Sequence, residues 1–225
     1  MEKLKEAAEI RGKMYMLLAK IYIKEIDKKM LDALKTMTPP EVGEPETGYE
    51  LDLSEGYQLV RSWLDSVNFE NVDEKLEYLA ADYAKIFLAA GQAEGKAAFP
   101  YESVYTNGNK ECGGVNIHLQ AIYLAKGLDI NPNMFKIEAD HIGLEMAYMA
   151  KLCEIEAGYY ENGDDEKAAE TVKEEIGFYR EHLSKWIVAF TTDVFKLAEL
   201  DFYKGFAKIT KGFITLEKEI LKQMR

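Results

Sequence analysis

The sequence predicts an all-α protein, a single globular multi-helical domain. Apolar residues recur at three- and four-residue steps through most of the 225 residues, which is the spacing of an amphipathic helix. No alternating strand pattern of useful length occurs beside them. Apolar residues make up 48% of the chain and charged residues 30%, a composition typical of a folded protein with a sizeable core. We therefore expect roughly eight to ten helices in one domain over residues 1–225.

The N-terminal part reads as a long helix, a short helix and a linker. The first helix is predicted from an apolar stripe that includes Ala7, Ile10 and Met14 and continues to Ile26. The following segment, TPPEVGEPETGYELDL, concentrates proline and glycine, which punctuate secondary structure. It predicts a Pro/Gly-rich linker near 38–53.

Two more helices and a long loop follow this linker. Ser54 is the predicted N-cap of a helix that buries Trp63, and Asp73 is the predicted cap of a helix that buries Phe87. The next stretch is glycine-rich and irregular, which predicts a long loop near 91–114. Loops of this length in a compact domain are often functional.

The second half of the chain is predicted to be almost wholly helical. Apolar spacing and stop signals such as Gly127 and Asn162 set the expected boundaries. We expect helices over 115–126, about 138–160 and about 164–181, followed by two more over 183–224.

The charge balance excludes several kinds of partner. The chain has 40 acidic and 28 basic residues, for a formal net charge of −12, so nucleic acid and anionic membrane surfaces are not expected to bind. A basic partner, such as an arginine-containing peptide, would be attracted. Cys112 and Cys153 form no CxxC motif or disulfide framework, and no signal peptide or membrane span is visible. These features predict a cytoplasmic protein without membrane insertion.

The sequence does not carry a complete metal-binding motif. Glu138 and His141 have the Glu-x-x-His spacing that puts two ligands on one helical face, but a di-iron bundle needs that motif twice. The other histidines, His118 and His182, have no glutamate three residues earlier. We therefore expect no metal.

Nucleotide and hydrolase motifs are also incomplete. The segment Gly91–Lys96 is one residue shorter than a P-loop between its glycines and lacks the serine or threonine that follows the lysine. Ser103 lies outside a Gly-x-Ser-x-Gly elbow. Asp140 and His141 are adjacent on a predicted helix, so their side chains diverge by about 100° and do not suit a catalytic triad. No enzyme activity and no cofactor are predicted.

Two interpretations of Asp140 and His141 remain open from the residues alone. In the first, Asp140 lies in the first turn of the predicted helix and interacts favourably with the helix dipole, while His141 forms a hydrogen bond in the core. Both can instead belong to a polar binding surface.

Four segments, in order, resemble a known family. These are LAADYAKIF at 79–87, FPYESVY at 99–105, ADHIGLEMAYMA at 139–150 and the pattern Glu181-His182-Leu183-x-x-Trp186. Together they resemble the TorD/DmsD/NarJ-like group of cytoplasmic chaperones for molybdenum redox enzymes, also called redox enzyme maturation proteins. Ala139 departs from the proline usual at that position, and GQAEGK replaces a Gly-Pro-Gly-like loop.

The resemblance implies a TorD-like helical fold and a non-enzymatic role. Such a chaperone binds the twin-arginine signal peptide, the apoprotein or both of a molybdopterin oxidoreductase catalytic subunit, and assists cofactor insertion and assembly before export. The alternatives are a nucleotide-binding switch and a structural helical subunit of a reductase complex. For the oligomeric state, a monomer and a domain-swapped dimer are the alternatives.

The resemblance also supplies candidate client-binding residues, because the matching loop and helix start carry them. Asp140 is the candidate acceptor for an arginine guanidinium. The full set is Pro100, Tyr101, Glu102, Ser103, Tyr105, Asp140, His141 and Glu145. We expect the loop and the helix start to lie side by side.

Overall fold

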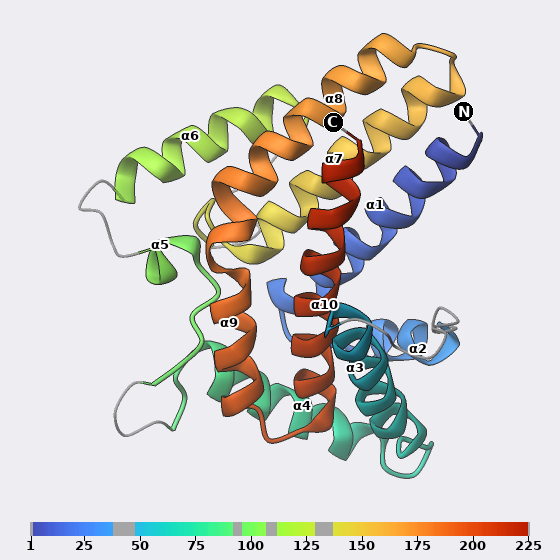
Figure 1. Cartoon of the computed structure of the whole chain (residues 1–225). Coiled ribbons are helices and arrows are strands. Elements are labelled where there is room, and N and C mark those ends of the chain that lie inside the picture. The colour runs from blue at the N-terminus through green and yellow to red at the C-terminus, as the bar shows by residue number, and fades with distance from the viewer. Residues whose placement is uncertain (1, 38–47, 92–95, 107–111, 129–136, 225) are drawn as a thin grey trace. The chain divides into compact units, whose positions relative to one another are not determined.

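Helices make up most of the chain that the computed structural model describes, which is residues 2–37, 48–91, 96–106, 112–128 and 137–224 (Figure 1). Within these residues no strand is present, and β pairing is limited to an isolated antiparallel bridge between Tyr101 and His141. None of the helices described is long and apolar enough to cross a membrane. The predicted all-α class is confirmed. The elements are α1 (Glu2–Ile23), α2 (Lys28–Thr36), α3 (Gly48–Asp65), α4 (Val72–Phe87), α5 (Glu102–Tyr105), α6 (Cys112–Ala125), α7 (Ile142–Glu161), α8 (Asp165–Phe178), the π-helical η1 (Tyr179–Leu183), α9 (Ser184–Leu197) and α10 (Asp201–Gln223).

The chain divides into two compact units, each assembled from separate stretches of sequence. The first unit contains Met1–Ile23, Pro100–Trp186 and Lys218–Arg225, and the second contains Lys24–Phe99 and Ile187–Glu217. Because both units are discontinuous in sequence, a change in composition along the chain could not have revealed the division between them. The expectation of one domain over 1–225 stays a prediction.

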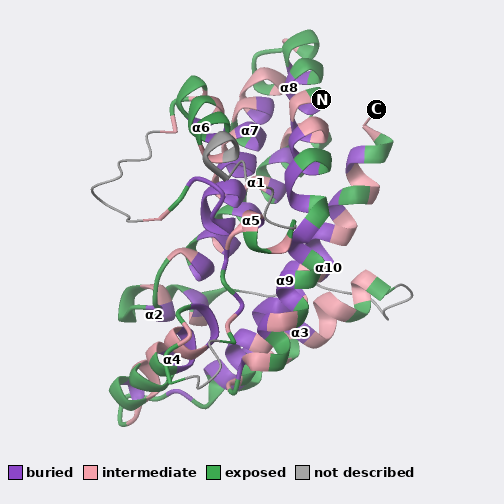
Figure 2. Ribbon diagram, turned by 90° about the vertical axis from the view of Figure 1, so that its left-hand side faces the viewer, coloured by how far each residue is buried: buried purple, intermediate pink, exposed green. Residues whose placement is uncertain are grey.

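Helix α7 forms the core of the first unit, with α1 and α8 packed along it (Figures 1 and 2). Its buried side chains lie on every face of the helix, as expected for a central helix. Close approach to α1 depends on Gly143, because a Cβ atom there would lie 3.1 Å from Ile23 Cβ and 3.2 Å from the Ala19 carbonyl oxygen. The residues predicted to face inward from this helix, among them His141, Leu144 and Leu152, are all buried.

The buried face of α1 differs from the predicted one. Ala7 and Ile10 are exposed, and Ile10 keeps 59% of its surface. The reason is Arg11, which is buried and forms ion pairs with Glu156 on α7, at 2.9 Å, and with Glu175 on α8. An apolar pattern cannot detect a charged side chain that is buried by its partners. The buried face instead consists of Ala8, Arg11, Tyr15, Leu18, Ala19, Ile21 and Tyr22.

An aromatic cluster forms the core of the second unit. The rings of Trp63 and Phe202 meet edge to face at 5.1 Å, and those of Phe87 and Tyr203 meet edge to face at 5.9 Å. Such arrangements add to the hydrophobic gain from burial. Trp63 and Phe87, which were predicted to face inward, are both buried here.

Helix α3 begins earlier than predicted. It starts at Gly48, so Ser54 lies inside the helix and is not its N-cap, and the part of the predicted linker after residue 47 is helical. The remainder of the linker lies outside the described residues. Contacts with α10 explain the early start, because Asp52 pairs with Lys211 at 2.8 Å. A tertiary contact of this kind overrides the local tendency of a Pro/Gly-rich segment.

Three other predicted boundaries differ. The loop expected near 91–114 contains α5 and the first turn of α6, while its residues 92–95 and 107–111 lie outside the described part. The break expected near 181–183 is absent, because the π-helical η1 joins α8 to α9. Helix α4 begins at Val72, with Asn71 at the N-cap, so Asp73 lies in the first turn.

Candidate functional site

The loop at 100–105 and the start of α7 lie side by side in the first unit, as expected. The Ile142 N–H donates to the Pro100 carbonyl oxygen at 2.9 Å, and the Glu102 N–H donates to the Asp140 carbonyl oxygen at 2.9 Å. These two bonds form the isolated bridge between Tyr101 and His141. The loop is therefore fixed to the helix start by backbone hydrogen bonds.

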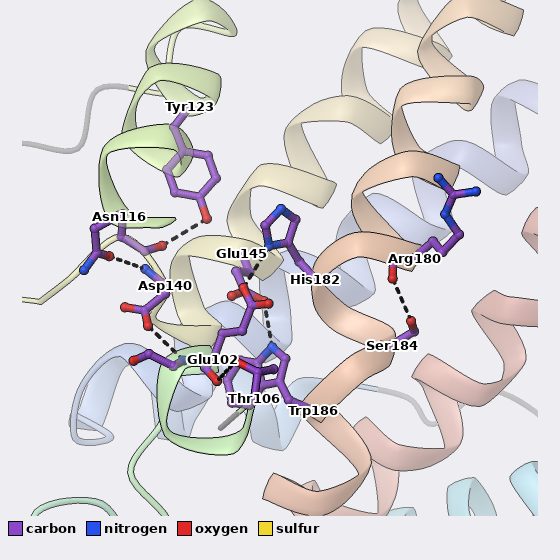
Figure 3. Close-up of polar contacts among 12 residues, drawn as sticks. Glu102, Thr106, Asn116, Tyr123, Asp140, Glu145, Arg180, His182, Ser184 and Trp186 are labelled. Carbon is purple, nitrogen blue, oxygen red and sulfur yellow. Dashed lines mark hydrogen bonds and ion pairs between the residues drawn. The ribbon is translucent and has the colours of Figure 1, made fainter. Parts of the chain in front are cut away.

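Asp140 caps the short helix α5 from a distant part of the chain (Figure 3). One of its carboxylate oxygens, Oδ2, accepts a hydrogen bond from the Ser103 backbone N–H at 3.0 Å. Its own backbone N–H donates to Asn116 Oδ1 on α6 at 3.2 Å. Asp140 is buried, with 2% of its surface exposed. An N-cap normally comes from the residue before the helix, but here the acceptor belongs to another segment.

His141, rather than Asp140, is the N-cap of α7. Its Nδ1 atom accepts a hydrogen bond from the Gly143 backbone N–H at 3.0 Å, so the helix begins at Ile142 and not near residue 138. Burial lowers the pKa of His141 to about 4. The ring is therefore neutral at physiological pH, which its role as an acceptor requires. The rings of Tyr101 and His141 pack edge to face, with centroids 5.1 Å apart.

The π-helical segment brings a histidine to the loop. His182 Nδ1 lies 2.8 Å from Glu102 Oε2, and both side chains are buried. A π-helical turn inserts one extra residue into a helix, and such turns occur often at functional sites. Trp186 follows this turn, and its ring stacks on the ring of Tyr105 with centroids 5.6 Å apart.

Glu145 lies beneath the loop and is completely buried. Its Oε2 atom accepts a hydrogen bond from the Trp186 Nε1–H at 3.1 Å (Figure 3). Burial, together with the nearby charge of Glu102, raises the pKa of Glu145 well above its ordinary range. Tyr123 on α6 closes the cluster from the other side, where its hydroxyl donates to the Ala139 carbonyl oxygen at 3.0 Å.

Burial divides the eight candidate residues into two sets. Tyr101, Ser103 and Tyr105 are half-buried, and Val104 between them is 52% exposed. The rest are buried, and these are Pro100, Glu102, Asp140, His141 and Glu145. The first set can reach a partner from the surface, whereas the second set shapes and supports the loop. Client binding by all eight stays a prediction.

Four residues of this cluster were not among the predicted candidates: Asn116, Tyr123, His182 and Trp186. His182 and Trp186 belong to a segment that resembles the family, and that resemblance was the available signal. No sequence signal pointed to Asn116 or Tyr123, because their partners, Asp140 and Ala139, are more than fifteen residues away.

The described residues offer one group of potential metal ligands, and it does not include the Glu-x-x-His pair of Glu138 and His141. Glu138 is exposed while His141 is buried and directs Nδ1 at a backbone N–H, so the two do not form a ligand pair. The group consists of Cys153, Glu156 and Glu175. Its two carboxylates already bind the guanidinium of Arg11, which occupies the place where a cation would lie.

Comparisons with known proteins extend over nearly the whole chain. The family model described as nitrate reductase delta subunit matches residues 50–192. The chaperone protein TorD of Vibrio vulnificus strain CMCP6 is 26% identical over 98% of this chain and 99% of the relative. The TorD chaperone of Shewanella pealeana is 26% identical over 95% of this chain and 90% of the relative. The TorD chaperone of Vibrio cholerae strain O395 is 25% identical over 100% of this chain and 97% of the relative. No solved structure matches the chain.

The names of these relatives agree with the predicted non-enzymatic role, since all three are chaperones. The family match covers more than half of the 225 residues and includes the loop, the start of α7 and the π-helical segment. The chain therefore belongs to the nitrate reductase delta subunit family, a family of TorD-like chaperones.

Proposed function

We propose that this chain is a cytoplasmic chaperone that matures a molybdopterin-containing oxidoreductase. It binds the twin-arginine signal peptide of the catalytic subunit, the apoprotein or both, and assists cofactor insertion and assembly before export. Support comes from the similarity to proteins named TorD chaperones over nearly their full length. Residues from three of the four segments that resemble the family also gather in one place in the first unit.

The observation that carries the proposal is the way the loop is presented. Backbone hydrogen bonds to Asp140 and Ile142 fix the loop. Its side chains Tyr101, Val104 and Tyr105 reach the surface wholly or in part. Aromatic and apolar side chains on a rigid base are suited to holding an apolar peptide segment, since little conformational entropy is lost on binding.

Charge favours the same kind of partner. The formal net charge of −12 attracts a peptide that carries paired arginines. Glu138 is exposed beside the buried Asp140, so an acidic side chain is available next to the loop. We assign the arginines to this acidic edge and the apolar stretch of the peptide to the loop side chains.

Calorimetric titration of the full chain with a client's twin-arginine signal peptide tests this function. Val104→Lys should weaken binding at least tenfold, because it removes an apolar contact and places a positive charge near the arginines. Ile10→Lys is the matched control, since Ile10 is exposed to a similar extent on α1 of the same unit. A second control is a peptide in which both arginines are replaced by lysine, which keeps the charge but loses the planar guanidinium.

Two results would contradict the proposal. In the first, Val104→Lys and Ile10→Lys bind the peptide as tightly as the parent. In the second, the peptide does not bind at all, while the chain purifies from its native cells as a stable part of a finished reductase. The second result would support a structural subunit.

A further inference from the structure

Two buried carboxyl groups face one another beneath the loop. Glu102 comes from α5 and Glu145 from α7, and 6% and 0% of their surfaces are exposed. Their carboxyl groups lie side by side (Figure 3), close enough for a side-chain hydrogen bond between them. Such a bond requires a proton, because two ionised carboxylates can only accept.

The hydrogen-bond partners of the two carboxyl groups show which group can carry that proton. Glu102 Oε2 faces His182 Nδ1 at 2.8 Å, and Glu145 Oε2 accepts from Trp186 Nε1–H at 3.1 Å. Glu145 Oε1 is buried and receives no hydrogen bond from any donor among the described residues. A buried acceptor without a donor is costly, and a proton on that oxygen turns it into a donor.

We infer that Glu145 is a neutral acid whose hydroxyl donates to the Glu102 carboxylate, and that this bond fastens α5, and with it the loop, to α7. Glu145 is thus a positioning residue. That the loop so positioned is the client-binding surface rests on the proposed function.

The surroundings of Glu145 favour the neutral form. The ionisable groups that face it are Glu102 on α5, Asp140 before α7 and Tyr123 on α6, with His182 of η1 behind Glu102. The first two are acids. Burial and these negative charges raise the pKa of Glu145, and the Trp186 hydrogen bond opposes them only in part.

The bond has a consequence for the pH dependence of folding. Above the ordinary pKa of a glutamic acid, Glu145 is ionised in the unfolded chain but protonated in the folded one. The folded chain therefore holds one more proton, and stability falls as pH rises, until the raised pKa of the folded chain is passed. A glutamine at this position should remove that loss, because its amide can donate to Glu102 without titrating.

The test compares Glu145→Gln and Glu145→Ala with the parent. Carbon-13 NMR of the glutamate carboxyl groups should show one carboxyl whose pKa lies well above the ordinary glutamate range, absent from Glu145→Gln. The melting temperature of Glu145→Gln relative to the parent should rise as the pH is raised above the ordinary range of a glutamate. Glu154→Gln is the matched control, since Glu154 is exposed on the same helix. The difference between the melting temperatures of this variant and the parent should not change over the same pH range.

Amide hydrogen exchange tests the fastening itself. The Ser103 and Thr106 N–H groups, which are bonded to Asp140 and Glu102, should exchange at least tenfold faster in Glu145→Ala but not in Glu145→Gln. The inference is overturned if every glutamate titrates in its ordinary range, or if both variants leave these amides equally protected. Peptide binding by the parent is measured separately, so its absence would count against the proposed function and not against the protonated pair.

Discussion

The carboxylate of Asp140 accepts a hydrogen bond from the backbone N–H of Ser103, 37 residues away in the sequence, at 3.0 Å. Asp82 makes the same kind of contact in the second unit, where its carboxylate accepts from the N–H groups of Glu199 and Leu200 just before α10. Both aspartates lie in segments that resemble the family. Each aspartate therefore accepts a hydrogen bond from a backbone N–H group near the start of a helix in a different segment of the chain.

Asp140→Ala should destabilise the chain and loosen the loop together. The Ser103 N–H would lose its acceptor in a partly buried place, which costs about 1–3 kcal/mol. Asp140→Asn should lose much less, because an amide oxygen can still accept the same bond. Chemical denaturation of the two variants measures the difference, with Glu138→Ala as an exposed control of equal charge. Equal stability of Asp140→Ala and the parent would refute this role for the carboxylate.

The two variants also separate the two interpretations of Asp140. If Asp140 acts through the loop, Asp140→Asn should bind a twin-arginine peptide nearly as well as the parent. If its charge contacts a guanidinium directly, Asp140→Asn should bind roughly tenfold more weakly and melt normally. Because Asp140 is buried, we expect the first result. Calorimetric titration of Asp140→Asn and the parent, together with their melting temperatures, distinguishes the two results.

Arg11→Met should be among the most destabilising changes in the first unit. Arg11 is buried with Glu156 and Glu175, and removing it would leave two buried carboxylates without their shared cation. Breaking a buried ion pair on one side costs about 3–5 kcal/mol. Arg61→Met is the control, because its pair with Asp65 is exposed and should contribute less than about 1 kcal/mol. Urea denaturation that finds the two variants equally stable would show that the buried pair adds nothing.

Buried His141 should make folding sensitive to mild acid. Its pKa is about 4 in the folded chain and about 6.5 in the unfolded chain. Between these values only the unfolded chain binds the proton, so stability falls as pH falls from about 6.5 to about 4. The difference corresponds to about 3 kcal/mol at most.

The test is His141→Asn, since asparagine is a good N-cap that does not titrate. The stability of this variant relative to the parent should rise as the pH falls from about 6.5 to about 4. His118→Asn, at an exposed position on α6, should show no such trend. A parent and a His141→Asn variant whose unfolding free energies run parallel across this range would contradict the prediction.

The apolar pattern predicted what depends on local periodicity. It predicted α4 and α7 with boundaries that differ by a few residues, and it identified Phe87 as buried, because these helices bury apolar side chains at helical spacing. It failed at Arg11, whose burial depends on two carboxylates more than a hundred residues away. A single sequence carries no record of such a partner.

The candidate site shows the same limit. Resemblance singled out the loop and the start of α7, and the two do lie together. It did not reveal that Asp140 and Glu145 are buried, nor that His182 reaches Glu102. That contact depends on a π-helical turn, which has no periodic signature in the sequence.

The two units should unfold in one transition, as the prediction of a single domain requires. The chain passes from one unit to the other after Ile23, Phe99, Trp186 and Glu217, so neither unit can be cut out as a continuous segment. Two of these passages fall inside α9 and α10, where melting one unit would fray a helix of the other. Cooperative loss of both units is therefore expected.

The two tryptophans of the chain supply the measurement, because Trp186 belongs to the first unit and Trp63 to the second. Trp63→Phe and Trp186→Phe each leave one fluorescent reporter. Within each variant, the fluorescence transition in urea should coincide with the loss of helical circular dichroism, since both report the same two-state event. Comparing two probes within one variant removes the effect of the substitution on stability. Fluorescence of Trp186 that changes at a clearly lower urea concentration than the helical signal would show that the first unit unfolds by itself, and the chain would then contain two domains.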